Sequence, residues 1–305
     1  MIEHFRTYAK INLFLRVLGL RPDGFHEVET ILHGVSLADD MWVGASTTGD
    51  VEIDMAWDEG LFGELPPLSE NLVFKVVERL VARGIAHHGL RVEIVKRIPI
   101  GAGMGGGSAN AAGAFVVLNE MLGGGLEWDD LIGLAAEVGS DVPYCIHGGT
   151  ALATGRGEKL TRLVAPEDLW FVLGISHRPL ATADVYRAWD RLGAPAERSS
   201  APLVLALGAG DVDEIAPLLH NDLEAAAFGL RPELGRKKEA LLAAGAAAAV
   251  VSGSGPTLFG LCRSSEGAQA VADRVKTSFD NVVCARSQDV CVERLGCADV
   301  PAARQ

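Results

Sequence analysis

A glycine-rich segment, set between a strand-like and a helix-like stretch, constrains the fold of this chain more than any other feature. Residues 99–112 read Pro-Ile-Gly-Ala-Gly-Met-Gly-Gly-Gly-Ser-Ala-Asn-Ala-Ala, with five glycines among the seven residues before Ser108. Residues 90–95 alternate as a half-buried strand does, and residues 109–122 are rich in helix formers. Glycines let backbone N–H groups approach an anion, and a helix N-terminus favours negative charge. The sequence therefore predicts a loop that binds polyphosphate.

Two familiar nucleotide-binding loops fit this segment poorly. A P-loop ends in Gly-Lys-Ser or Gly-Lys-Thr, whereas Gly107 is followed by Ser-Ala. Gly101, Gly103 and Gly106 satisfy G-x-G-x-x-G, which alone is a weak indication of a dinucleotide site. However, residues 123–128 read Gly-Gly-Gly-Leu-Glu-Trp, which is not the acidic strand end that such a site needs. A glycine-rich turn without a ligand stays open as the structural alternative.

Charge and cysteine content restrict the class of protein. The formal net charge of −13 argues against a general nucleic-acid or anionic-membrane surface, so any phosphate must be held by a local basic pocket. The five cysteines are odd in number and include no C-x-x-C pair, which argues against a disulfide framework and against a zinc site. The N-terminus lacks a signal-peptide core, and residues 241–251 form too short an apolar run to span a bilayer. We expect a cytoplasmic protein with a small-molecule substrate.

Strands and helices mix without strict β-α-β repetition, which predicts an α+β fold. We expect two domains, residues 1–160 and residues 161–305. A loop or a disordered connection is expected between residues 192 and 211. Ser69 is the expected N-cap of the first helix, and a hairpin is expected around residues 148–149 and 155–157. Strands are expected within residues 5–55 and at 90–95, 169–175, 248–252, 258–262 and finally 281–285. Helices are expected from residue 69 and at 109–122, 129–137, 182–192, 211–219, 232–244 and 266–279.

Three segments resemble, in order and spacing, the motifs of one kinase superfamily. They are residues 9–13 (Ala-Lys-Ile-Asn-Leu), the loop at 99–112, and residues 251–256 (Val-Ser-Gly-Ser-Gly-Pro). Together they are similar to the GHMP small-molecule kinases, which include galactokinase, homoserine kinase and mevalonate kinase. The resemblance implies ATP with Mg²⁺, an N-terminal ribosomal-protein-S5-like domain that binds ATP, and a C-terminal ferredoxin-like α/β-sandwich domain.

Two further segments resemble one branch of that superfamily. Residues 21–27 (Arg-Pro-Asp-Gly-Phe-His-Glu) and 139–143 (Gly-Ser-Asp-Val-Pro) are similar to the kinases that phosphorylate a cytidine-diphosphate-linked methylerythritol on its 2-hydroxyl, in the non-mevalonate route to isoprenoids. The resemblance implies that Phe25 stacks on the cytosine, that His26 hydrogen-bonds it, and that Tyr186 stacks on its other face. An aromatic pair suits a base because every base has a π-face.

The two expected catalytic residues can also be judged without the resemblance. Asp141 lies between Gly139 and Pro143, so a constrained turn aims its carboxylate; a local capping role is the alternative. Lys10 shares a strand face with Asn12, which brings two polar groups to one place, although a solvated edge lysine would also fit. By resemblance, Asp141 accepts the proton of the substrate hydroxyl while Lys10 holds that carboxylate and the developing negative charge.

The resemblance also implies the remaining contacts. Ser108 is a candidate Mg²⁺ ligand, and no paired acidic motif identifies the metal site. Four residues depart from the family pattern: Tyr8, Met104, Ala109 and Phe25, the last of which lacks a hydroxyl donor. The expected ATP-binding residues are Asn71, Lys96, Pro99, Gly101, Gly103, Met104, Gly105, Gly106, Gly107, Ser108 and Asn110, and the expected substrate-binding residues are Asn12, Phe25, His26, Thr182, Tyr186, Ser252 and Gly253.

Three other functions stay open at this point. A sibling kinase that acts on another small alcohol is disfavoured by the His26 segment. A dinucleotide-dependent oxidoreductase would account for the spaced glycines but would leave Lys10 and Asp141 without a role. A non-catalytic nucleotide-binding module would not need those two residues.

Overall fold

A computed structural model describes residues 2–46, 48–58, 64–84, 89–121, 125–193 and 198–297. Its larger sheet has the strand order β12-β1-β2-β4-β3; β5 pairs with β2 and β6, and β8 pairs with β1. The pairs β3·β4 and β1·β8 are parallel and the others antiparallel. The strands are β1 (Glu3–Leu20), β2 (His26–Ala45), β3 (Val51–Trp57), β4 (Leu90–Lys96), β5 (Thr150–Gly155), β6 (Lys159–Leu163), β8 (His220–Asn221) and β12 (Val292–Cys297).

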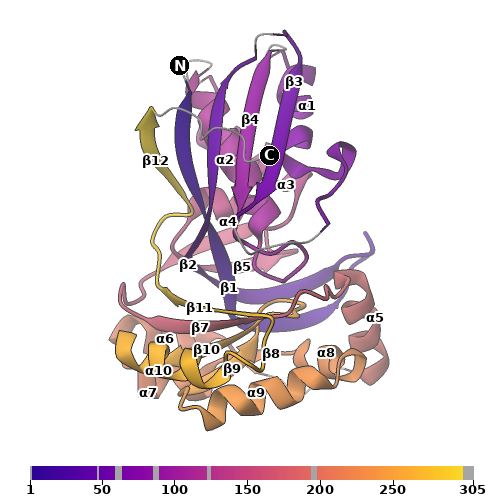
Figure 1. Ribbon diagram of the computed structural model, residues 1–305. Helices are drawn as coiled ribbons and strands as arrows, with labels where there is room; N and C mark the ends of the chain where they lie inside the picture. Colours follow the sequence, from indigo (N-terminus) through magenta and orange to yellow (C-terminus); the bar gives the residue numbers. More distant parts are fainter. Residues whose placement is uncertain are drawn as a thin grey trace.

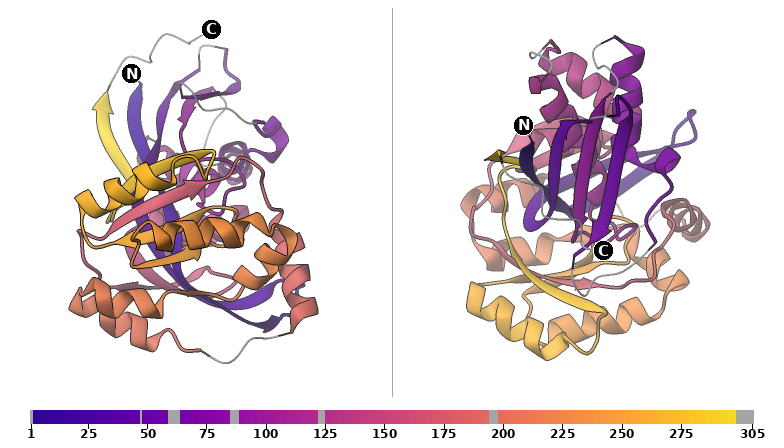
Figure 2. Two further views of the ribbon diagram at one scale, coloured as in Figure 1. Left: turned by 60° about the horizontal axis from the view of Figure 1, so that its bottom comes forward. Right: turned by 45° about the horizontal axis from the view of Figure 1, so that its top comes forward.

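Helices cover one face of the upper part of this sheet (Figure 1; Figure 2, right). They are α1 (Leu72–Ala82), α2 (Gly106–Met121), α3 (Trp128–Val138) and α4 (Val142–His147), with a short 3-10 turn η1 (Leu68–Glu70) before α1. Helix α2 is rich in alanine and is buried on nearly all sides. It lies so close to β2 that a Cβ at Gly113 would be 2.6 Å from Met41 Cε. Small side chains therefore allow α2 to lie directly against the sheet.

A second, antiparallel sheet has the order β11-β7-β10-β9 and carries its helices on the outer side (Figure 2, left). Its strands are β7 (Trp170–Ile175), β9 (Ala248–Val251), β10 (Leu258–Cys262) and β11 (Asn281–Arg286). The remaining helical segments are α5 (Thr182–Leu192), α6 (Ala201–Ala209), α7 (Val212–Ile215), η2 (Ala216–Leu218), α8 (Glu224–Leu230), α9 (Glu233–Ala243) and α10 (Ser265–Val275).

The lower part of the β1–β2 pair packs against the smaller sheet. Ala9, Ile11 and Leu13 of β1 are fully buried and share a cluster with Phe171 of β7 and Phe259 of β10. Side chains alternate along a strand, so the intervening residues of β1 point to the opposite face. That alternation directs the polar residues of this segment away from the core between the sheets.

The α+β fold class is confirmed, and several local predictions need correction. Residues 201–209, expected as part of a loop or a disordered connection, form α6, whose nearly uniform apolar sequence lacks the periodicity that would have indicated a helix. The N-cap of α1 is Asn71, whose side chain accepts from Val73 N, and not Ser69. The predicted strand 281–285 is not the last one, because β12 follows it and pairs with β1.

The region around residue 148 also differs from expectation. Gly155, Gly157 and their neighbours form the expected hairpin turn, between β5 and β6. Gly148 instead ends α4, a helix that was not predicted, and its N–H donates to Tyr144 O. Helix α2 begins at Gly106, three residues before its expected start, while residues 122–124 lie outside the described residues.

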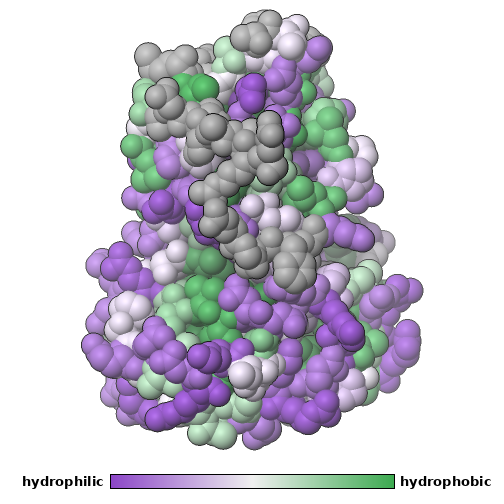
Figure 3. Space-filling model, viewed as in Figure 1, coloured by the Kyte–Doolittle hydropathy of each residue, from purple (hydrophilic) through white to green (hydrophobic). Residues whose placement is uncertain are grey.

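Polar side chains predominate over the lower half of the face in Figure 3. Beneath it, α10 buries Ala268, Val271, Ala272 and Val275 and turns its polar residues outward. Within the described residues, no helix is both long and apolar enough to cross a membrane.

Candidate active site

Two cavities meet at the glycine-rich loop. The larger, about 730 Å³, is lined by residues of β1, β2, α5, the start of α4 and the turn after β9. The smaller, about 300 Å³, lies between the start of α1 and the outer side of the loop. Gly103, Gly105 and Ser108 line both cavities. The loop is therefore a shared wall, across which a group on a ligand in one cavity could reach a ligand in the other.

The predicted catalytic pair lies in the larger cavity. Lys10 Nζ is 3.4 Å from Asp141 Oδ2, and the Lys10 side chain is only 5% exposed whereas that of Asp141 is 36% exposed. Asp141 precedes α4, but its side chain makes no capping hydrogen bond to that helix. The carboxylate is thus held by the lysine and open to the cavity, which is the arrangement that a base for a bound hydroxyl group needs.

A chain of hydrogen bonds orients Lys10. Its Nζ donates to Asn12 Oδ1 at 2.9 Å, and Asn12 Nδ2 donates to Thr30 Oγ1 at 2.9 Å. The Thr30 hydroxyl donates in turn to Phe14 O at 2.6 Å. All three polar side chains are nearly buried, so each keeps one orientation toward the cavity.

The loop itself is clamped between β1 and the turn that follows β9. Lys10 N donates to Met104 O at 3.0 Å, and Ser252 Oγ donates to Gly103 O at 2.9 Å. Gly103 has a φ of +78°, and a Cβ there would lie 2.2 Å from Ser252 O. Only glycine fits this position, because of both the left-handed backbone and the contact.

Most residues expected to bind ATP line the smaller cavity, with two qualifications. Met104 is fully buried in the core and lines neither cavity. Lys96 is 1% exposed and forms an ion pair with Asp39. The other expected residues that line the smaller cavity are Asn71, Pro99, Gly101, Gly103, Gly105, Gly106, Gly107, Ser108 and Asn110.

The expected cytosine-binding residues gather at the other end of the larger cavity. His26 stacks on Tyr186 with ring centroids 4.6 Å apart, and its Nε2 lies 2.8 Å from Asp190 Oδ1. Phe25 is 49% exposed, with the Arg156 guanidinium 4.7 Å from its ring centroid. Burial raises the pKa of Tyr186, so this phenol stays neutral. The two rings expected to face opposite sides of a base thus already contact other protein groups.

The remaining expected substrate residues divide into two groups. Gly253 and Thr182 line the larger cavity, and Thr182 Oγ1 is 3.0 Å from Ser254 Oγ. Ser252 lies beneath the loop, fully buried, and does not line the cavity. It therefore supports Gly103 from within the protein.

Sequence reasoning missed several residues of the larger cavity. Arg156 lies in the β5–β6 turn and lines the cavity. The two glycines beside it predict a turn but do not indicate a functional role for the arginine. Arg187 and Asp190 belong to α5, and Thr30 to β2, and all three line the cavity. Nothing in the sequence around Asp190 indicates its place in the site, because it contacts His26, which lies 164 positions away in the chain.

Comparison with known proteins agrees with these observations. Residues 71–149 match the GHMP kinases N terminal domain, and residues 203–281 match GHMP kinases C terminal. The chain is 42% identical to the 4-diphosphocytidyl-2-C-methyl-D-erythritol kinase of Pelotomaculum thermopropionicum over 279 residues, 92% of this chain and 96% of the relative. It is 44% identical to the kinase of that name from Nocardia farcinica, over 88% of this chain and 87% of the relative.

Solved structures extend the comparison. A 4-(cytidine 5'-diphospho)-2C-methyl-D-erythritol kinase superposes with a TM-score of 0.77 at 30% identity, covering 94% of this chain and 99% of the other. A homoserine kinase from Cytophaga hutchinsonii superposes with a TM-score of 0.75 at 23% identity, over 96% and 97% of the two chains, and supports the fold alone. The chain therefore belongs to the GHMP kinases, and within them to the family of 4-diphosphocytidyl-2-C-methyl-D-erythritol kinases.

Proposed function

We propose that this chain transfers the γ-phosphoryl group of ATP to the 2-hydroxyl of 4-diphosphocytidyl-2-C-methyl-D-erythritol. The observation that carries the proposal is the Lys10–Asp141 pair, which lies where the two cavities share the wall formed by Gly103, Gly105 and Ser108. Nucleotide in the smaller cavity and alcohol in the larger one would meet beside this pair.

In this mechanism Asp141 orients the acceptor hydroxyl and accepts its proton as the oxygen attacks the γ-phosphorus of ATP. The bond from that phosphorus to the bridging oxygen of the β-phosphate breaks, and ADP leaves. Lys10 holds the Asp141 carboxylate and stabilises negative charge on the transferring group, while Asn12 keeps the lysine in place. Phosphoryl transfer passes through a loose transition state, so alignment and charge stabilisation matter more than strong basicity. The glycine-rich loop and the start of α2 contribute backbone N–H groups for the phosphates.

Mg²⁺ fits the shared wall of the two cavities. In kinases this ion is held by one or two protein oxygens together with phosphates and water. The Ser108 hydroxyl lines both cavities, so it would hold the ion together with phosphate oxygens and water. When bound, the ion neutralises charge on the phosphates. Within the described residues no cluster of three or more His, Cys, Asp or Glu forms a separate metal site.

The far end of the larger cavity supports a cytidine-diphosphate-linked acceptor. Phe25, His26 and Tyr186 provide aromatic surfaces and a hydrogen-bonding imidazole for the base. Of the cations among the described residues of this cavity, Lys10 pairs with Asp141 and Arg187 with Asp184. Arg156 lies over the Phe25 ring at the end of the cavity where the base would bind, and we assign its guanidinium to the acceptor diphosphate.

The proposal also covers the organisation of the chain. Residues 1–160 would form the ATP-binding domain and residues 161–305 the second domain, with β8 and β12 of the latter pairing with β1 of the former. A cytoplasmic location fits substrates that are both phosphorylated metabolites.

A coupled assay with ATP and the cytidyl acceptor tests the function directly. We expect turnover with this acceptor and a loss of about 100-fold or more in kcat/KM with its uridine analogue, because a site built for cytosine leaves polar groups unpaired against uracil. Equal turnover of both forms would reduce the assignment to a kinase of another small alcohol. Binding of NAD with no binding of ATP would instead favour an oxidoreductase.

A further inference from the structure

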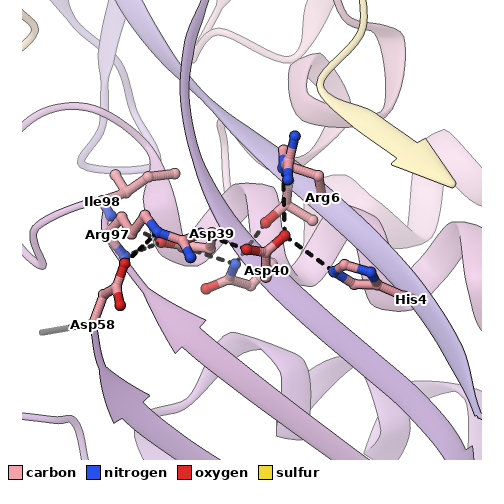
Figure 4. Close-up of polar contacts among 9 residues, drawn as sticks. His4, Arg6, Asp39, Asp40, Asp58, Arg97 and Ile98 are labelled. Atoms are coloured by element: carbon pink, nitrogen blue, oxygen red, sulfur yellow. Dashed lines mark hydrogen bonds and ion pairs between the residues drawn. The ribbon is translucent and has the colours of Figure 1, made fainter. Parts of the chain in front are cut away.

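One buried carboxylate holds both ends of the glycine-rich loop. Asp39 of β2 is 0% exposed. Its Oδ1 accepts hydrogen bonds from Arg97 N at 2.7 Å and Ile98 N at 2.8 Å, and its Oδ2 accepts from Asn110 Nδ2 at 3.0 Å and from Lys96 Nζ. Figure 4 shows Asp39 beside Arg97 and Ile98. Four donors on one carboxylate leave it fully satisfied.

These partners lie on the two sides of the loop. Lys96, Arg97 and Ile98 precede it, and Asn110 follows it in the first turns of α2. Lys96 Nζ also donates to Asn110 Oδ1 at 2.9 Å, and Asn110 Nδ2 also donates to Thr7 Oγ1 at 2.8 Å. The entrance and exit of the loop are thus tied to each other and to the sheet through one charged group.

This network changes the roles of two residues expected to contact ATP. Lys96 and Asn110 line the smaller cavity, but their polar atoms are already engaged inside the protein. A buried lysine paired with a buried carboxylate has no free charge to offer a ligand. Their contribution to nucleotide binding would therefore come through the position of the loop that they hold.

We propose that Asp39 is a positioning residue that sets the geometry of the phosphate loop for ATP, acting through Lys96, Asn110 and the Arg97–Ile98 backbone. The proposal rests on the assignment of the smaller cavity to ATP in the proposed function. Without the carboxylate, the loop would lose its anchor at both ends, and binding of ATP would have to order it. The acceptor cavity has its own supports, at Asn12 and Thr30, and would be little affected.

Asp40 offers a matched control, since it is the next residue along β2 and its carboxylate also forms ion pairs. Its Oδ2 accepts from Arg97 Nη1 at 2.5 Å, and its Oδ1 lies 3.1 Å from His4 Nε2 and 3.3 Å from Arg6 Nε (Figure 4). Burial opposes its ionisation, but the hydrogen bond and charge of Arg97 outweigh burial and keep the pKa of Asp40 below its usual value. None of these contacts involves the loop backbone.

The experiment compares Asp39→Asn with Asp40→Asn. We expect Asp39→Asn to raise KM for ATP about tenfold or more while KM for the acceptor stays within about twofold, whereas Asp40→Asn leaves both KM values near those of the parent. Hydrogen exchange of the Arg97 and Ile98 amides should accelerate in Asp39→Asn and not in Asp40→Asn. An unchanged KM for ATP, or equal rises in both KM values, overturns the proposal.

Two further measurements keep the outcome decisive. Asp39→Asn leaves the Lys96 ammonium buried without a counter-charge and could fail to fold for that reason. In that case the double variant Asp39→Asn with Lys96→Met removes both charges, and it should show the same rise in KM for ATP. Direct binding of ATP by calorimetry tests Asp39 even if the parent protein does not phosphorylate the cytidyl acceptor. The proposed acceptor would then be wrong, but the affinity of Asp39→Asn for ATP would still show whether Asp39 positions the loop.

Discussion

Replacing Asp141 by asparagine should separate the chemistry of the site from the stability of the fold. The two side chains have nearly the same shape, and Asp141 makes no capping hydrogen bond to α4. The folded protein would lose the attraction of the carboxylate to the helix N-terminus, about 0.3–1 kcal/mol. It would also lose the Lys10 pair, worth no more than about 1 kcal/mol because Asp141 is one-third exposed at 36%. The total should be below about 2 kcal/mol.

The expected effect on turnover is larger. A positioned general base contributes roughly 10²–10⁴-fold in rate, which corresponds to about 3–5 kcal/mol in the activation barrier. Asparagine keeps a hydrogen-bond acceptor for the substrate hydroxyl but cannot take its proton. We therefore expect kcat to fall by about 100-fold or more while ATP affinity stays close to that of the parent.

The assay measures kcat with both substrates saturating, the Kd for ATP by calorimetry and Tm by thermal unfolding. Asp211→Asn is the matched control, because Asp211 also precedes a helix, accepts from Asp213 N at 2.8 Å and lines neither cavity. Asparagine is as good an N-cap as aspartate, so this variant should keep parental kcat and Tm. A kcat for Asp141→Asn above about one-tenth of the parental value would remove Asp141 from the role of base.

Three further predictions follow from the site and the core. Gly105→Ala should reduce the free energy of unfolding by about 1–2 kcal/mol because φ at this position is +69°. It should also lower kcat because the new Cβ would lie 3.1 Å from Lys10 Cγ, and turnover equal to that of the parent would contradict this. Arg156→Gln should raise KM for the acceptor about tenfold and leave KM for ATP unchanged, and a similar rise for Arg187→Gln would argue against a specific role. Burial lowers the pKa of His33 to about 4. The unfolded chain, with a pKa near 6.5, therefore binds the proton first, and the free energy of unfolding should fall by about 3 kcal/mol as pH drops from about 6.5 to 4. In denaturant titrations of His33→Gln at several pH values, the free energy of unfolding should not show this fall.

Local features of the fold could be predicted from the sequence where neighbouring residues decide them. The alternation in β4, the glycines of the loop and the helix formers of α2 predicted strand, loop and helix in the right order, since each depends on backbone conformation over a few residues. The expectation failed at α6, where an almost wholly apolar sequence has no periodic face. It also failed at β12, because pairing with β1 brings together residues nearly 300 positions apart.

The candidate site divides in the same way. The sequence alone determined that a glycine-rich loop would join a strand to a helix, and it identified the polar pair Lys10 and Asn12 on one strand face, because these properties follow from backbone geometry. Only the tertiary structure decided that Lys96 pairs with Asp39, that Ser252 supports the loop from below, and that Arg156 covers Phe25. Each of these contacts depends on the register of strands and the approach of distant turns. The residues next to a side chain in the sequence do not identify the partner that it contacts in the folded protein.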